Sequence, residues 1–195
     1  MAKTTNRGTV IQDPPLAAFL FSSTAMSWVW LVVRVWVGYQ WITSSLRKVG
    51  DAAWVQTGLA LKAFWERAVL IPEKGRPLIT FDWYRSFLQY LLDTQSYTWF
   101  AKLVAYGELL IGIALVVGAF VGIAAFFGAL MNWNFMMAGT ASTNPMLFLL
   151  AILLVLAWKV AGYVGLDRYL LPFLGTPWKP GRIFEKNTGR STALA

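Results

Sequence analysis

Long apolar runs separated by short polar breaks dominate the pattern of this chain. Four runs approach the roughly 20 residues that an α-helix needs to cross about 30 Å of hydrocarbon, and they cover residues 25–45, 97–117, 120–138 and 146–164. The last break, AGTASTNP, ends with Pro145, which suits the first turn of the next helix. The pattern therefore predicts an all-α integral membrane protein built as a four-transmembrane-helix bundle.

A stretch of about fifty residues between the first two runs has a different pattern. Its first part places apolar side chains on one helical face with Lys62 and Glu66 opposite, and Pro72 then ends this helix. After a turn, FDWYRSFLQYLL resumes amphipathic character with Asp82 as a candidate N-cap. Tryptophan and tyrosine recur here, as in helices at the lipid headgroup level. We expect an amphipathic interfacial helical insertion over residues 46–96, which either covers one end of the bundle or docks a partner.

The flanking segments complete the expected domain organisation. Residues 1–24 form a polar N-terminal segment, and the opening MAKTTNRGTVIQDPP lacks the apolar core of a cleavable signal peptide. We therefore expect the first span to act as its own insertion signal. Residues 25–175 form the membrane domain, and residues 176–195 form a basic, extended tail.

Composition supports the membrane class. Hydrophobic residues make up 57% of the chain and charged residues 13%, against about 25% charged residues in soluble domains. The net charge of +8 is spread through loops and tails without a dedicated basic face, which argues against a nucleic-acid partner. An even number of spans puts both termini on one side. The expected location is the cell inner (plasma) membrane, with both termini in the cytoplasm.

The chain contains no histidine and no cysteine. These side chains hold most haem, iron–sulfur, copper and zinc centres, so we expect no intrinsic cofactor and no metal site. A bound quinone or a lipid is the remaining candidate for a bound group. Electron transfer would then use a quinone directly or a redox centre on another subunit.

Two charges lie near the middle of apolar runs. Arg34 and Glu108 have similar depths in the first and second runs, within about one helical turn. A charge at the bilayer centre costs at least about 2.5–3.5 kcal/mol and normally finds a partner inside the protein. We therefore expect Arg34 and Glu108 to form a salt bridge. This pair either fixes the helix register, or serves as a proton or anion relay or a polar contact to a quinone head group, and would then be the candidate catalytic pair.

Further polar residues follow in the third run. An asparagine in a helix at lipid depth needs a hydrogen-bond partner, so we expect Asn134 to face the bundle interior. A quinone head group would lie near Glu108 and Asn134, with Trp133 and Trp41 as aromatic walls. Asn132, two residues before Asn134, is a second polar residue of the same run.

Basic residues near the ends of the spans form another group. Arg47, Lys48 and Lys102 either draw in an anion or flank the membrane as solvated side chains. Lys159 and Asp167, near the end of the last span, suit interfacial anchors.

Several segments together resemble the DoxX/DoxD family of four-helix membrane proteins: RVWVGYQWITSSLRKVG, FAKLVAYGELLIG, NFMMAGTASTNP and AGYVGLDRYLLP. The resemblance covers roughly residues 25–175. In this family, DoxD is a membrane subunit of thiosulfate:quinone oxidoreductase, which joins two thiosulfates into tetrathionate and passes electrons to quinone. The resemblance implies that Arg34, Glu108 and Asn134 match the family's span-one arginine, span-two glutamate and span-three asparagine. Gly122 stands where relatives often carry an arginine.

Three functions stay open. The favoured one is a non-catalytic or accessory subunit of a larger respiratory or photosynthetic membrane complex, since tryptophan-rich surfaces and small-residue ridges fit that role. The second is a quinone-linked oxidoreductase subunit of the thiosulfate:quinone oxidoreductase type. The third, a small-molecule or proton pathway, is indicated only by the intramembrane charges. The expected partners are membrane lipids and other membrane-complex subunits, and whether the chain is an enzyme stays open.

Overall fold

The computed structural model describes residues 3–5, 8–10 and 13–176, and nearly all of the expected C-terminal tail lies outside these residues. Apart from a short antiparallel hairpin, the described chain is helical. The elements in chain order are β1 (Lys3–Thr5), β2 (Gly8–Val10), α1 (Pro15–Ser22), η1 (Thr24–Met26), α2 (Ser27–Val49), α3 (Ala52–Val55), α4 (Leu59–Val69), α5 (Asp82–Asp93), α6 (Tyr97–Val117), α7 (Val121–Met137), α8 (Asn144–Leu156), α9 (Trp158–Ala161) and α10 (Asp167–Phe173).

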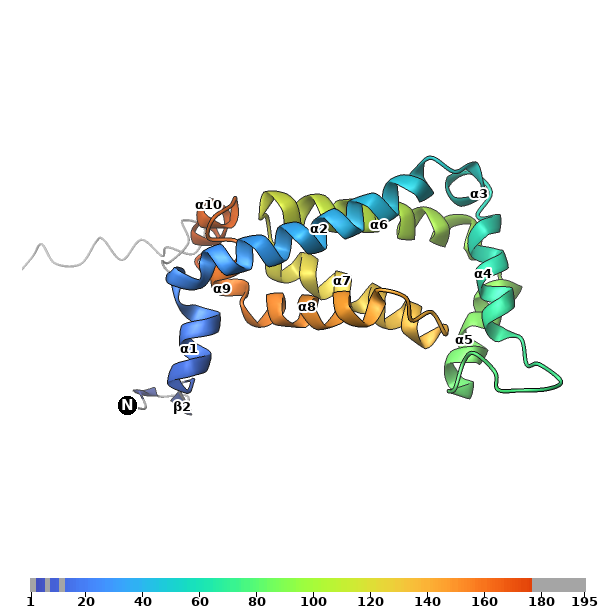
Figure 1. The fold of residues 1–195 in the computed structure, drawn as a ribbon, viewed down its shortest axis with the longest axis horizontal. Helices are drawn as coiled ribbons and strands as arrows, with labels where there is room; N and C mark the ends of the chain where they lie inside the picture. The colour runs from blue at the N-terminus through green and yellow to red at the C-terminus, as the bar shows by residue number, and fades with distance from the viewer. Residues whose placement is uncertain (1–2, 6–7, 11–12, 177–195) are drawn as a thin grey trace, which may run out of the picture.

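Four long helices, α2, α6, α7 and α8, lie lengthwise and form the body of the molecule (Figure 1). Helix α2 packs along α6, and α7 packs along α8. The first pair is in backbone contact, because a Cβ atom on Gly38 would lie 2.8 Å from the carbonyl oxygen of Gly112. Small residues permit this approach, which fixes the register of the two antiparallel helices.

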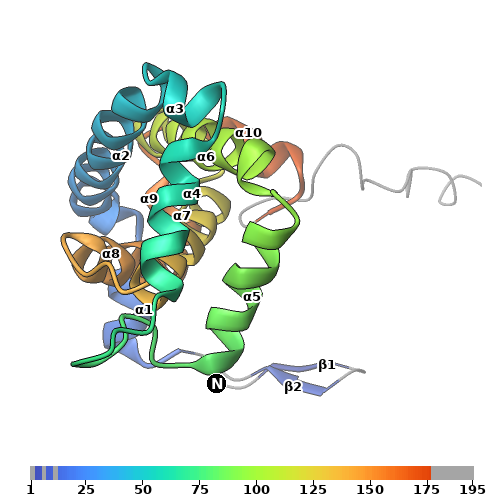
Figure 2. The same cartoon turned by 90° about the vertical axis from the view of Figure 1, so that its right-hand side faces the viewer.

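The expected insertion forms α3, α4 and α5, which lie across one end of the bundle (Figures 1 and 2). Leu61 and Trp65 of α4 and Leu88 of α5 are buried in a cluster with Ala101 of α6. Gly58 begins α4 with a φ of 73°, and a side chain there would collide with the carbonyl of Tyr97. The insertion therefore covers one end of the bundle, and we call α3, α4 and α5 the lid.

Two local details of the insertion concern its helix ends. The first lid helix of any length, α4, ends at Val69, shortly before Pro72, as the sequence predicts. Asp82 is not the N-cap of α5, because Phe81 holds that position. Asp82 instead forms an ion pair with Arg85 at 2.5 Å, one turn further along the helix.

The sequence predicts a polar segment over residues 1–24, but this segment contains an apolar helix. This helix, α1, packs against α9, and Phe21 near its end stacks on Trp30 with ring centroids 5.7 Å apart. The indole Nε1 of Trp30 donates a hydrogen bond to the carbonyl of Leu20 at 2.8 Å. The helical part of the protein therefore begins near residue 15.

One described helix, α6, is long and apolar enough to cross a membrane, and α1 with α2 gives a second candidate that is bent by 52°. Helices α7 and α8 are apolar but shorter, with 17 and 13 residues. The fourth expected span is interrupted at Ala157, where Trp158 packs so closely on Gly122 that a side chain would not fit at that glycine. By length and composition, one or two of the described helices are therefore able to cross a membrane, which is weak evidence for a membrane location.

Candidate functional site

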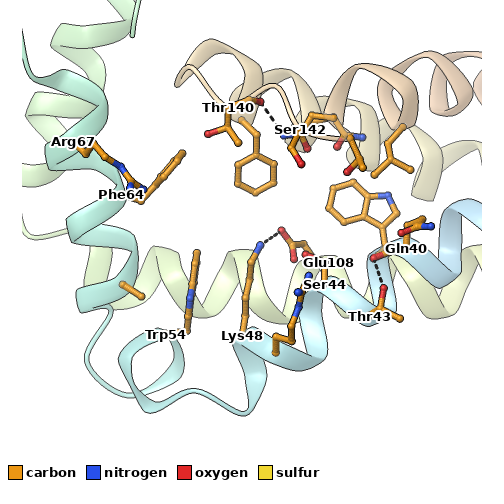
Figure 3. A pocket seen from close by; sticks show the side chains of 18 residues that line it. Gln40, Thr43, Ser44, Lys48, Trp54, Phe64, Arg67, Glu108, Thr140 and Ser142 are labelled. Atoms are coloured by element: carbon orange, nitrogen blue, oxygen red, sulfur yellow. Dashed lines mark hydrogen bonds and ion pairs between the residues drawn. The ribbon is translucent and has the colours of Figure 1, made fainter. Parts of the chain in front are cut away.

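A polar cavity of about 510 Å³ lies where the lid meets the bundle (Figure 3). This volume falls within the roughly 300–1,000 Å³ of typical small-molecule sites. Its walls come from α2, the lid, α6, α7 and the loop before α8. The residues that line it include Gln40, Trp41, Ser44, Arg47, Lys48, Trp54, Phe64, Arg67, Glu108, Asn132 and Phe135.

Glu108 and Lys48 form a buried ion pair in this cavity, with Nζ 2.5 Å from Oε1. The Glu108 side chain is 1% exposed and that of Lys48 is 18% exposed. The ammonium group also lies 5.0 Å from the ring centroids of Trp54 and Phe135, so two aromatic faces support it. This pairing compensates the cost of burying the carboxylate.

Arg34 does not pair with Glu108, so that prediction is wrong. The contact of Gly38 with Gly112 places Glu108 about two turns along α2 from Arg34. Nη1 of Arg34 instead donates to the carbonyls of Leu115 at 2.5 Å and Val116 at 2.7 Å, and Nη2 donates to Val164 at 2.6 Å. The last carbonyls of a helix lack intrahelical partners and attract a cation. Arg34 therefore secures the end of α6.

Asp167 acts beside Arg34 at that same end of the bundle and is buried, so it is not an exposed interfacial anchor. Its carboxylate accepts hydrogen bonds from the backbone N–H groups of Phe120 at 2.5 Å and Val121 at 2.9 Å, where α7 begins. Burial raises the pKa of Asp167 above its ordinary value, while the two hydrogen bonds and the charge of Arg34 act in the opposite direction. Both residues hold the α6–α7 hairpin in place.

Four polar atoms of the cavity lining form no hydrogen bond with any described residue: Nε1 of Trp41, Oε2 of Glu108, and both Nδ2 and Oδ1 of Asn132. The Ser44 hydroxyl lies beside the Glu108 carboxylate (Figure 3). Buried polar groups are normally paired, and each one left unpaired costs about 1–3 kcal/mol. Two donors and two acceptors, each almost fully enclosed, therefore belong to residues that line this cavity and lack a partner within the described part of the chain.

Only some of the residues expected around a quinone head group line this cavity. Trp41 and Glu108 line the cavity together, but Asn134 lies outside it, where its Oδ1 accepts a hydrogen bond from Tyr84 at 3.1 Å. Residues two apart on a helix point to nearly opposite sides, so Asn132 is the one that faces inward. Trp133, 37% exposed, stacks on Trp83 with ring centroids 6.5 Å apart and is not part of this cavity.

A sequence signal could have identified Asn132. Gly128 follows Ala125 by three residues, Asn132 follows Gly128 by four, and all three are buried. Such spacing marks one face of a helix. Gly128 also positions the indole, since a Cβ atom there would lie 3.3 Å from Nε1 of Trp41.

The cations expected near span ends separate into two groups. Arg47 and Lys48 line the cavity, whereas Lys102 is exposed on α6 and does not line it. Arg67 of the lid, which sequence analysis missed, also reaches the cavity (Figure 3). Three cationic side chains and one carboxylate, that of Glu108, thus line the same cavity.

A second, mostly apolar cavity of about 420 Å³ shares Phe64 and Phe135 with the first as lining residues. Among its few polar groups is the hydroxyl of Tyr84, which donates to the backbone carbonyl of Asn134 at 3.0 Å. Burial raises the pKa of Tyr84 to about 12.

Comparison with known proteins adds no family: no protein-family model, no curated protein and no solved structure matches the chain. Its class is therefore defined by its own fold and site. The protein is helical, has one or two candidate membrane-spanning helices, and contains a polar cavity under a helical lid.

Proposed function

We propose that this protein is a multi-pass membrane protein of the DoxX/DoxD kind that provides a quinone-binding cavity to a larger membrane oxidoreductase complex. The observation that carries the proposal is the set of four unpaired polar atoms on residues that line one cavity. A bound head group with its own donors and acceptors would pair them. The proposal combines the accessory-subunit and quinone-linked interpretations of the sequence.

The four long helices would be the spans. Large apolar side chains are exposed on the outer faces of all four, among them Val32, Leu110, Ile123 and Leu149. Exposed apolar surface of this extent suits contact with lipid or with apolar partner helices. Residues 144–161 of α8 and α9 would cover about 27 Å, close to the hydrocarbon thickness. Both termini would lie in the cytoplasm, with the lid at the opposite face of the inner membrane.

The polar atoms suit both redox forms of a quinone head group. The N–H groups of Trp41 and Asn132 are able to donate to its carbonyl oxygens. The free oxygens of Glu108 and Asn132 are able to accept from the hydroxyls of the reduced form. Trp54 and Phe135 add aromatic walls to the same cavity.

Electrons would come from a redox centre on another subunit, since this chain has no histidine or cysteine to hold a conventional haem or iron–sulfur cluster. Arg34, the expected partner of Glu108, has no place in this site. Its guanidinium donates to two backbone carbonyls at the far end of α6 and to that of Val164.

Binding to the purified chain in phosphatidylcholine nanodiscs tests the proposal, with decylubiquinone as the probe and quenching of tryptophan fluorescence as the readout. We expect saturable binding that Asn132→Leu removes. The control is Gln89→Leu, which replaces an exposed amide of the lid that lines neither cavity, and it should still bind. Equal affinity of wild type and Asn132→Leu would contradict the proposal.

A further inference from the structure

The apolar cavity has no part in the function proposed so far. Its wall comes from the lid helices α4 and α5 and from α6 and α7. Two of its lining residues, Leu103 and Leu110, are 58% and 69% exposed, so the cavity borders the outer apolar surface of α6. Its volume of about 420 Å³ is also within the usual range of ligand sites.

Two aromatic residues are shared by this cavity and the polar one. Phe64 of the lid and Phe135 of α7 line both, and their ring centroids are 6.5 Å apart in an edge-to-face arrangement. On α6, Glu108 lines the polar cavity and its neighbour Gly107 lines the apolar one. Two consecutive residues of the same helix thus line the polar cavity and the apolar cavity.

We propose that the two cavities form one binding site for an amphiphile with a polar head and a single hydrocarbon tail. The head lies among Trp41, Glu108 and Asn132, where it pairs the free polar atoms. The tail passes Phe64 and Phe135 into the apolar cavity and reaches the lipid beside Leu110. This inference rests on the proposed function and specifies its ligand class: a tailed molecule is selected over a tail-less one.

The structure offers a substitution that fills the apolar cavity alone. A Cβ atom built on Gly107 would meet no atom within 4 Å, in contrast to Gly38 and Gly112 of the neighbouring helix contact, where it would collide. A side chain at Gly107 therefore enters open space. Replacing a glycine inside a helix also favours helix formation, by roughly 0.5–1 kcal/mol for alanine, so the variant should fold.

The test compares two quinones that share a head group, tail-less ubiquinone-0 and decylubiquinone, on full-length protein in phosphatidylcholine nanodiscs. Wild type should bind decylubiquinone at least about tenfold more tightly, because each buried methylene adds affinity. Gly107→Phe should keep the affinity for ubiquinone-0 and lose the preference for the tail. Ile113→Phe is the control: it adds a ring to an exposed position of the same helix that lines neither cavity, and it should keep the preference.

Because all variants share the same lipid, partition of the tailed probe into the bilayer cancels in these comparisons. Binding of ubiquinone-0 shows that a variant is folded, and Gly107→Leu, a smaller filling, replaces the phenylalanine variant if that one fails to bind it. A tail preference that survives in both filled variants overturns the tail site while the proposed function stands. Absence of binding of either quinone to wild type overturns the proposed function, and the tail site with it.

Discussion

Replacing Asn132 by leucine separates a binding role of this residue from a structural one. The amide is fully buried, and neither Nδ2 nor Oδ1 has a partner within the described part of the chain. Leucine keeps nearly the same volume and removes both polar atoms. An unpaired buried polar group costs about 1–3 kcal/mol, and water in the adjoining cavity would offset part of that cost. We therefore expect ligand-free Asn132→Leu to match wild type or to be up to about 3 kcal/mol more stable.

Denaturant unfolding in detergent micelles, with and without decylubiquinone, measures both parts of this prediction. A ligand at one hundred times its Kd stabilises the folded state by about 2.7 kcal/mol. Wild type should show this gain and Asn132→Leu should not. The control Gln89→Leu replaces an exposed amide of the lid that lines neither cavity, so it should stay within about 0.5 kcal/mol of wild type and keep the gain from the ligand. Two results would refute the reasoning: an Asn132→Leu protein more than about 1 kcal/mol less stable than wild type, or one that the ligand stabilises equally.

Three further predictions concern the ion pair, the lid and the redox activity. Lys48→Met should cost about 3–5 kcal/mol of unfolding free energy because it leaves the buried Glu108 carboxylate without a partner, whereas Glu108→Gln should cost less because Lys48 is partly exposed. The double variant should recover much of the loss, and additive costs in this double-mutant cycle would contradict the pairing. Burial raises the pKa of Tyr84 to about 12 from an ordinary 10, so the stability of wild type should fall as pH rises from about 10 to 12. Tyr84→Phe should lack this contribution to the fall, and parallel stability–pH curves of the two proteins would argue against a buried phenol. The purified chain should show no visible chromophore and negligible thiosulfate-dependent quinone reduction without a partner, and robust turnover in nanodiscs would make it an oxidoreductase in its own right.

The apolar pattern predicts much of this fold because run length and period determine helices directly. Helix α6 has the bounds expected from sequence, and the lid is helical on both sides of Pro72. Helix α1 was missed because its short apolar stretch begins at Pro15 within an otherwise polar segment. The break at Ala157 depends on the contact of Trp158 with α7, which no local pattern reveals.

The site was harder to predict because its contacts depend on helix register and on the lid. Matching depths suggested Arg34 as the partner of Glu108, but the register is fixed by the glycine contact between α2 and α6, which brings Lys48 to the carboxylate. Arg67 joins the cavity only because the lid folds over the end of the bundle. Trp41 and Glu108, both expected near a polar core, line the same cavity, and an indole and a charge within apolar runs stand out without any tertiary information.

Photolabelling with an azido-quinone tests the central claim most directly, because it locates the head group on the chain. Protein in nanodiscs would be irradiated with the probe, digested and mapped by mass spectrometry, with excess decylubiquinone as competitor. The account predicts competable labels on the peptides that carry Trp41, Glu108 and Asn132, and their loss in Asn132→Leu. Competable labels confined to the outer faces of α6 and α7, at residues such as Leu110 and Ile123, would contradict it.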